Sequence, residues 1–86
     1  MKTIYKYNLS VDDKQVLYVP EKRRPLCIQL QNGKPCLWVE VDNNSRTVPM
    51  SLITRGTGHP LPDKLGLYIG TYQIPGLVFH VYEEGE

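Results

Sequence analysis

The chain has 86 residues, of which 10 are lysine or arginine and 9 are aspartate or glutamate, giving a formal net charge of +1. This length is enough for one domain and too short for two independent cores, so we expect residues 1–86 to form a single domain. The near balance of charge provides no general attraction to DNA, RNA or anionic lipid, which argues against a non-specific nucleic-acid-binding protein.

Short β-rich segments follow one another along the chain, separated by turn-forming residues at intervals of about 8–12 residues. No segment shows the apolar periodicity of a helix. Asp12, Asp13 and the segment from Pro20 to Pro25 interrupt the first strands. We predict an all-β domain, a small sandwich or barrel of about seven mostly antiparallel strands, with these spans: residues 2–9, 15–19, 25–31, 35–41, 47–55, 67–73 and 77–83.

Hydropathy and size indicate where the chain acts and in what form. No apolar run approaches the roughly 20 residues of a membrane span, and the segment from Met1 to Lys6 lacks the apolar block of a signal peptide. We therefore expect a cytoplasmic protein. A chain this short buries only about 60–65% of its unfolded surface, so self-association would stabilise it. Together with six tyrosines against one phenylalanine, this predicts a homo-oligomer, either a dimer or a tetramer.

The dipeptide Asn32-Gly33 predicts a hairpin with a two-residue type I′ turn, because both central positions of that turn need a positive φ. In the resulting register Cys27 lies opposite Trp38, and period-2 alternation sorts the side chains onto two faces. One face is expected to be core: Leu26, Ile28, Leu30, Leu37, Val39 and Val41. The other is expected to be polar around Trp38: Cys27, Gln29, Gln31, Lys34, Cys36 and Glu40.

Trp38 thus faces away from the main core, and two interpretations stay open. Another strand or the aliphatic stems of neighbouring side chains could cover the indole. Alternatively, Trp38 is a subunit contact or a stacking platform for a base, since tryptophan offers a large contact area at low entropic cost.

The same register predicts that both cysteines are reduced thiols. Cys27 and Cys36 are diagonal neighbours, about 7–8 Å apart, whereas a disulfide prefers roughly 5.5 Å. The two cysteines form no CxxC pair, and His59 and His80 show no ligand spacing. We therefore expect neither a metal site nor a cofactor.

The connection between the fifth and sixth strands, residues 56–66, is longer than a hairpin needs, and long loops are often functional. It begins with Gly56-Thr57-Gly58-His59, directly after Arg55. Arginine and the backbone N–H groups at the glycines could hold an anion by charge-assisted hydrogen bonds. The alternative is a tight turn whose glycines only permit a positive φ. The chemistry of the residues favours neither.

Catalytic patterns give no match. No serine lies in a nucleophile-elbow context, and the Gly-Thr-Gly segment lacks the lysine and helix of a phosphate-binding loop. His80 lies on a strand between Phe79 and Val81, where a structural histidine is the more common interpretation. We therefore expect no catalytic residue and no enzyme.

Three segments nevertheless resemble a widespread family of short phage proteins: Gly56-Thr57-Gly58-His59-Pro60, Tyr68-Ile69-Gly70-Thr71-Tyr72-Gln73 and Val78-Phe79-His80-Val81-Tyr82-Glu83. The segments Ile4 to Tyr7 and Gln31 to Trp38 extend the resemblance over nearly the whole chain. The family is similar in turn to viral nucleotide sponges, which sequester the cyclic oligonucleotide signals of bacterial CBASS-type or Thoeris-type immunity. The resemblance implies an immune-evasion protein of the host cytoplasm that binds such a signal without cleaving it.

The resemblance also implies a pocket at the loop and the following strand, shared between subunits. The expected ligand-binding residues are Arg55, Gly56, Thr57, Gly58, His59, Gly70, Thr71, Gln73 and, as a stacking platform, Trp38. The alternative function is a protein-interaction module, a phage accessory or host-takeover factor whose exposed aromatic residues contact a host protein.

Overall fold

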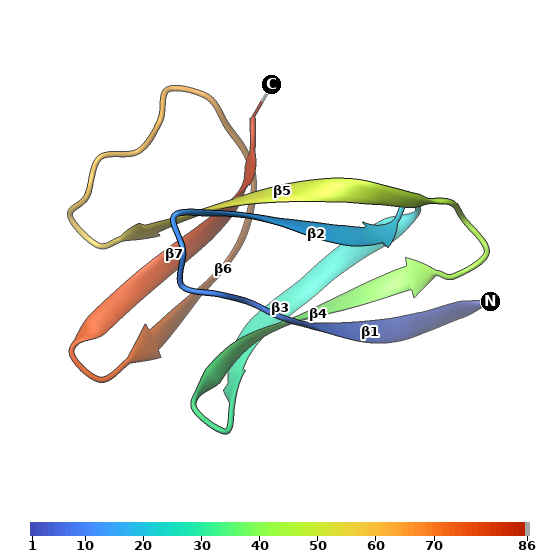
Figure 1. Ribbon diagram of the computed structural model, residues 1–86, viewed down its shortest axis with the longest axis horizontal. Coiled ribbons are helices and arrows are strands. Elements are labelled where there is room, and N and C mark those ends of the chain that lie inside the picture. The colour runs from blue at the N-terminus through green and yellow to red at the C-terminus, as the bar shows by residue number, and fades with distance from the viewer. Residues whose placement is uncertain (86) are drawn as a thin grey trace.

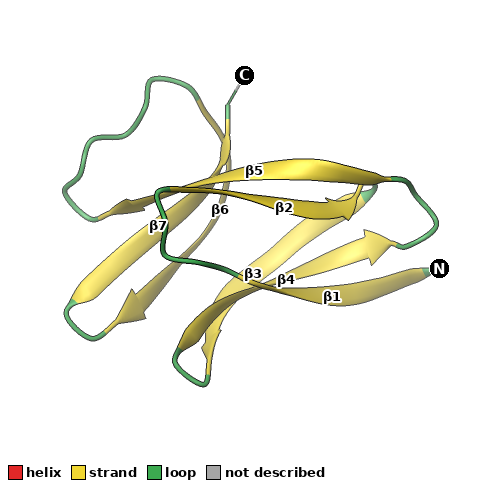
Figure 2. Cartoon of the chain, viewed as in Figure 1, coloured by secondary structure: helices red, strands yellow, loops and turns green. Residues whose placement is uncertain are grey.

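The computed structural model describes residues 1–85, so Glu86, the last residue of the expected domain, lies outside the described part. Seven antiparallel strands form two sheets, with the orders β1-β4-β3 and β2-β5-β7-β6 (Figures 1 and 2). No helix that could cross a membrane occurs in this part of the chain. The strands are β1 (Lys2–Asn8), β2 (Lys14–Pro20), β3 (Arg23–Gln31), β4 (Lys34–Asp42), β5 (Thr47–Gly56), β6 (Leu65–Ile74) and β7 (Leu77–Glu84).

These elements confirm the predicted small all-β fold, and every strand boundary lies within two residues of its predicted position. The break between the second and third strands is shorter than the expected segment from Pro20 to Pro25, because β3 already begins at Arg23. Pro25 lies inside that strand. Since β3 is at the edge of its sheet, a residue without an N–H group is tolerated there.

One continuous hydrophobic core lies between the sheets and takes side chains from both of them. Alternation along each strand turns one side of the strand to this core and the other side to the surface. At one end, Arg23 of β3 and Glu83 of β7 link the two sheets through an ion pair of 3.3 Å. The buried members of the core are Leu9, Val19, Ile28, Leu37, Val39, Val41, Met50, Leu52, Ile69, Tyr72 and Val81.

The predicted hairpin is confirmed in its turn and in the register of its strand pair. Asn32 and Gly33 have φ values of 54° and 77°, and Cys27 lies opposite Trp38. The prediction that Leu26 and Leu30 belong to the core is wrong, because they are 40% and 41% exposed. Leu26 lies at a bulge between Pro25 and Cys27, which interrupts the alternation, and Leu30 lies beside the turn, where cover is incomplete.

Both cysteines are free thiols, as predicted, but Cys36 does not lie on an open polar surface. It is 1% exposed, because Asn8 of the neighbouring β1 lies across from it. The thiol Sγ lies 3.4 Å from Asn8 Oδ1 and 3.6 Å from the carbonyl oxygen of Lys34. β1 pairs with the edge of β4 that does not pair with β3, and Asn8 of β1 therefore covers this part of the expected polar face.

Gly70 marks the place where β6 of one sheet lies close to β3 of the other. A Cβ atom at position 70 would lie 3.1–3.2 Å from three side-chain atoms of Ile28. A larger residue at position 70 would therefore force the Ile28 side chain to shift. This gives Gly70 a packing role on the core side of β6.

Gly70→Ala is expected to lower the free energy of unfolding by about 1–3 kcal/mol, the usual cost of overpacking a core. Urea titration of the variant against the parent protein measures this. Ile28→Val, which removes the Cδ1 atom that the new methyl group would meet, should reduce the cost of Gly70→Ala. An equal cost in both backgrounds would show that the close approach to Ile28 is not the cause.

Candidate functional site

The chain leaves β5 through a tight turn, beyond which the connection to β6 extends away from the sheets (Figure 1). The N–H of His59 donates to the carbonyl of Gly56 at 3.1 Å, and Gly58 has a φ of 88°. The N–H of Thr57 donates to the carbonyl of Val78 on β7, also at 3.1 Å. Two N–H groups of this segment are therefore used in hydrogen bonds within the chain. The N–H of Gly58 has no such bond among the described residues, so it can donate to a ligand.

The glycines of this turn thus have a structural explanation. Gly58 permits the positive φ that the turn needs. A Cβ atom on Gly56 would lie 3.1 Å from two atoms of the His59 imidazole, so the absence of a side chain lets that ring fold back over the turn. The consequence is that the His59 ring lies beside the end of β5, where it remains exposed.

His80 of β7 connects the turn with β6 through both of its ring nitrogens. The strand register places Arg55, His80 and Thr71 side by side on the outer face of their sheet. Thr57 Oγ1 lies 2.7 Å from His80 Nε2, and Thr71 Oγ1 lies 3.0 Å from His80 Nδ1. The hydroxyl of Tyr68 in turn bonds to Thr71 Oγ1. This chain of four polar side chains fixes the imidazole in one orientation.

Two of these side chains, Thr57 and His80, line a pocket of about 230 Å³ on the outer face of the sheet. It brings together one arginine and two histidines from β5, the turn and β7, and none of its described lining residues is acidic. Such a lining favours an anion. The lining residues are Arg55, Gly56, Thr57, Gly58, His59, Leu61, His80 and Tyr82.

Arg55 stands at the boundary of this pocket and a second hollow of about 430 Å³, which Asp13, His59 and Pro60 also line. Its Nη1 atom donates to the carbonyls of Thr54 and Asp13, at 3.0 Å and 3.3 Å. A guanidinium has five N–H donors, so others remain for a ligand. Within the described residues, the other three arginines each pair with a glutamate, whereas Arg55 has no carboxylate partner.

The pocket also has an apolar side. Leu61 and Tyr82 line it, and the Tyr82 ring meets Tyr68 edge to face with 5.3 Å between ring centroids. Ile53 lies opposite Tyr82 on the same outer face and is only 2% exposed, although it is outside the main core. An apolar wall beside a cationic one suits a ligand that carries both a ring and a charged group.

The predicted site residues are only partly brought together. Arg55 to His59 all line the pocket, and Thr71 lies directly behind it through its bond to His80. Gln73 is on the same face but nearer the β6–β7 turn, opposite Val78, and does not line the pocket.

The remaining expected residues lie elsewhere. Gly70 faces the core. So does Tyr72, two residues further along β6, and burial there raises the pKa of its hydroxyl group. Trp38 is on β4 of the other sheet and does not line the pocket. The structure therefore separates the expected stacking platform from the expected phosphate contact.

Sequence reasoning missed four residues of this region: His80, Tyr82, Leu61 and Tyr68. A signal was present for two of them, because strict alternation on β7 places His80 and Tyr82 on the face opposite Phe79 and Val81. What the sequence did not show is that Arg55 lies opposite His80, since that pairing joins residues far apart in the chain.

The family model described as a domain of unknown function, DUF7352, matches residues 1–86. Neither a curated protein nor a solved structure matches the chain.

Thr71→Val is expected to lower the free energy of unfolding by about 0.5–1.5 kcal/mol, because it removes the hydroxyl between His80 and Tyr68. Thr71→Ser should retain most of the stability. The matched control is Thr47→Val, at an exposed position of β5, which should change little. Urea titration measures all three variants, and an equal loss in the serine variant would show that the hydroxyl is not what matters.

Proposed function

The chain belongs to the DUF7352 family, and we propose that it is a phage immune-evasion protein that binds a cyclic oligonucleotide signal and holds it without cleavage. The observation that carries this proposal is the pocket in which Arg55, His59 and His80 converge with no described acidic residue in the lining. A phosphate group is the anion that this set of donors suits. The site of action would be the cytoplasm of the bacterial host.

A nucleotide would have to extend beyond the pocket at Arg55. The pocket of about 230 Å³ is smaller than typical ligand pockets, which hold roughly 300–1,000 Å³. The second hollow shares Arg55 and His59 with it and offers room for the rest of a larger ligand, although Asp13 also lines it, so that an uncharged part of the ligand suits it better than a second phosphate. In this arrangement Arg55 contacts phosphate between the two hollows, while Leu61 and Tyr82 face a base or a ribose.

Cleavage is a second candidate function with a specific observation behind it. Thr57 Oγ1 lies 2.7 Å from His80 Nε2, and Thr71 bonds the other ring nitrogen. A hydroxyl beside an oriented imidazole is the arrangement of a base-activated nucleophile. The two candidates differ in what becomes of the ligand, since a sequestering protein returns it unchanged.

The protein-interaction alternative also has a structural basis, at the free edge of the second sheet. Tyr18 of β2 is 69% exposed, and Val16 is exposed on the same face of that edge strand. An exposed aromatic beside an open strand edge can contact a host protein or a second copy of the chain.

Arg55→Ala is expected to weaken binding of the cyclic nucleotide by about 10- to 150-fold, since a charge-assisted hydrogen bond contributes roughly 1.5–3 kcal/mol. His59→Ala should cost less, about 0.5–1.5 kcal/mol for an ordinary hydrogen bond. A thermal-shift screen of cyclic di- and trinucleotides and of cyclic ADP-ribose products identifies the ligand, and calorimetry measures the variants.

The control is Arg46→Ala, which removes an exposed guanidinium that pairs with Glu21 away from the pocket. Ligand released by protease digestion is then analysed by chromatography. Intact ligand supports sequestration, whereas a linear product would replace it with the cleavage candidate. If no nucleotide binds, the protein-interaction alternative takes its place.

We further expect the protein to be a homo-oligomer whose subunits share the site, because the core is small and Tyr18 and Val16 leave apolar surface exposed on the edge strand β2. Light scattering after gel filtration should give a mass of at least twice the 9.9 kDa of one chain. Tyr18→Glu tests whether the β2 edge is the contact, since a buried unpaired charge would disrupt it. A monomer at high concentration would contradict the shared site.

A further inference from the structure

A second surface, on the other sheet, carries most of the lysines of the chain. Strand register places the even-numbered residues of β1 and β4 together on the outer face of the sheet β1-β4-β3. Lys6 lies opposite Trp38, and Lys34 lies at the hairpin end of the same face. We call this surface the lysine face; its members are Lys2, Ile4, Lys6, Asn8, Arg24, Cys27, Gln29, Gln31, Lys34, Trp38, Glu40 and Asp42, with Lys22 at its edge. Cys36 shares this register but is buried.

The lysines of the lysine face form no ion pair with the described residues, whereas Arg24 of the same face pairs with Glu40. None of the five ion pairs within residues 1–85 includes Lys2, Lys6, Lys22 or Lys34. Lys6 instead donates to the neutral amide oxygen of Gln31 at 2.6 Å.

The two carboxylates of the face already form ion pairs with other cations. Glu40 pairs with Arg24 at 3.3 Å, and Asp42 lies 3.5 Å from the N-terminal ammonium group. The N–H of Asn44 donates to Asp42 and, with that ammonium, lowers the pKa of its carboxyl group. A surplus of positive charge therefore remains on this face.

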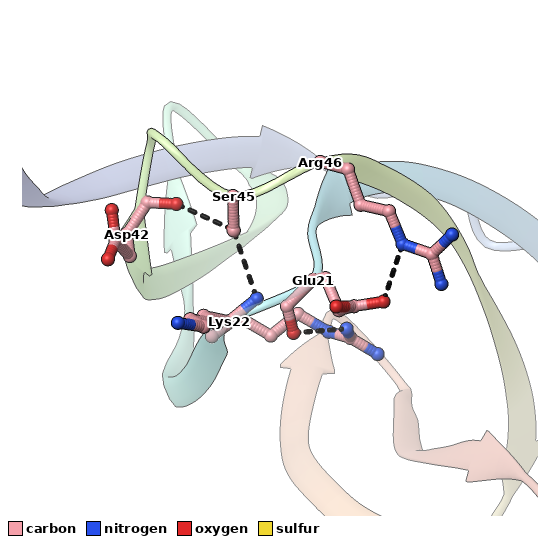
Figure 3. A network of polar contacts seen from close by, with 6 residues as sticks. Glu21, Lys22, Asp42, Ser45 and Arg46 are labelled. Atoms are coloured by element: carbon pink, nitrogen blue, oxygen red, sulfur yellow. Dashed lines mark hydrogen bonds and ion pairs between the residues drawn. The ribbon is translucent and has the colours of Figure 1, made fainter.

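One end of the lysine face forms a pocket of about 250 Å³, lined by Lys2, Lys22, Arg23, Arg24, Glu40, Val41 and Asp42. A hydrogen-bond network fixes its rim by joining the β2–β3 turn to the β4–β5 turn (Figure 3). Ser45 Oγ donates to the carbonyl of Asp42 at 2.7 Å and accepts the N–H of Lys22 at 3.1 Å. Arg46 pairs with Glu21 at 2.7 Å beside it. The cations at this end are thus presented by a constrained backbone.

Trp38 lies in the middle of the face, between this pocket and the hairpin end, and is half-buried, so that part of the indole remains accessible. Its neighbours include the exposed Ile4, which adds apolar surface, and Lys6, its cross-strand partner. The nine residues of β4 span about 30 Å, and adjacent residues of one face are about 7 Å apart along the strand. Cations therefore lie on both sides of one aromatic ring along a path long enough for several nucleotides.

From this arrangement we propose that the lysine face binds single-stranded nucleic acid, with one base stacked on Trp38 and the backbone phosphates on the lysines. Stacking on an aromatic ring combined with a cationic track is the general mode of sequence-independent single-strand binding. An unpaired base can reach a ring held on a sheet surface, whereas a base pair inside a duplex cannot. This site is distinct from the pocket at Arg55, so neither proposal depends on the other.

The test uses a labelled ten-nucleotide oligo-dT and fluorescence anisotropy at several salt concentrations. Trp38 is the only tryptophan of the chain, so stacking should also quench the intrinsic fluorescence. Lys2→Gln with Lys6→Gln should reduce the slope of log K against log salt by about 1.4, which is 0.7 for each lost contact. The matched control changes Lys14 and Lys64 to glutamine, outside this face, and should leave the slope unchanged.

Trp38→Leu, which keeps an apolar side chain, should weaken binding by about 5- to 150-fold. Arg55→Ala should leave oligonucleotide binding intact, so failure of the nucleotide proposal and failure of this one can be told apart. The proposal is overturned by no binding at 20 mM salt, by equal affinity for a hairpin duplex, by binding without fluorescence quenching, or by an equal loss of slope in the control. Binding of a host protein to this face in place of the oligonucleotide would also overturn it.

Discussion

Burial of the inner side chains of both sheets in a single shared core is the constraint from which the two candidate sites arise. Each sheet gives its inner side chains to that core, so each retains one outer face. On the sheet β2-β5-β7-β6 the outer face carries Arg55, His80 and Thr71, and on the other sheet it carries Trp38 and Lys6. Because the core separates the faces, a change on one should leave the other largely unaffected.

The pocket at Arg55 depends on how β5 ends. The strand runs one residue past Arg55 and then turns sharply, while the N–H of Thr57 still bonds to β7. This keeps the Thr57 hydroxyl within reach of His80. Had the chain continued straight into the loop, the histidine would have lost one of its two partners. Gly56 and Gly58 therefore allow both the tight turn and the position of the Thr57 hydroxyl beside His80.

Local signals in the sequence were sufficient for the fold and insufficient for the site. The Asn32-Gly33 turn sets its own register, because the two strands it joins are adjacent in the chain. The assignment of Leu26 to the core was wrong because a bulge interrupts the alternation on which the assignment relied. The pairing of Arg55 with His80 joins strands separated by a long loop and another strand, so no local pattern reports it. Sequence reasoning consequently found the turn but not the histidine beside it.

Net charge describes this protein poorly, because the described ion pairs include most of its arginines but few of its lysines. Three of the four arginines pair with glutamates, and Lys14 pairs with Glu84. This consumes several carboxylates within the fold and leaves Arg55 on one outer face, four lysines on or beside the other, and Lys64 in the connection between β5 and β6. A formal charge of +1 argues against a general attraction to polyanions, yet it does not describe a surface on which the negative charges are already paired. Where the uncompensated cations lie, not how many there are, determines what this small domain can bind.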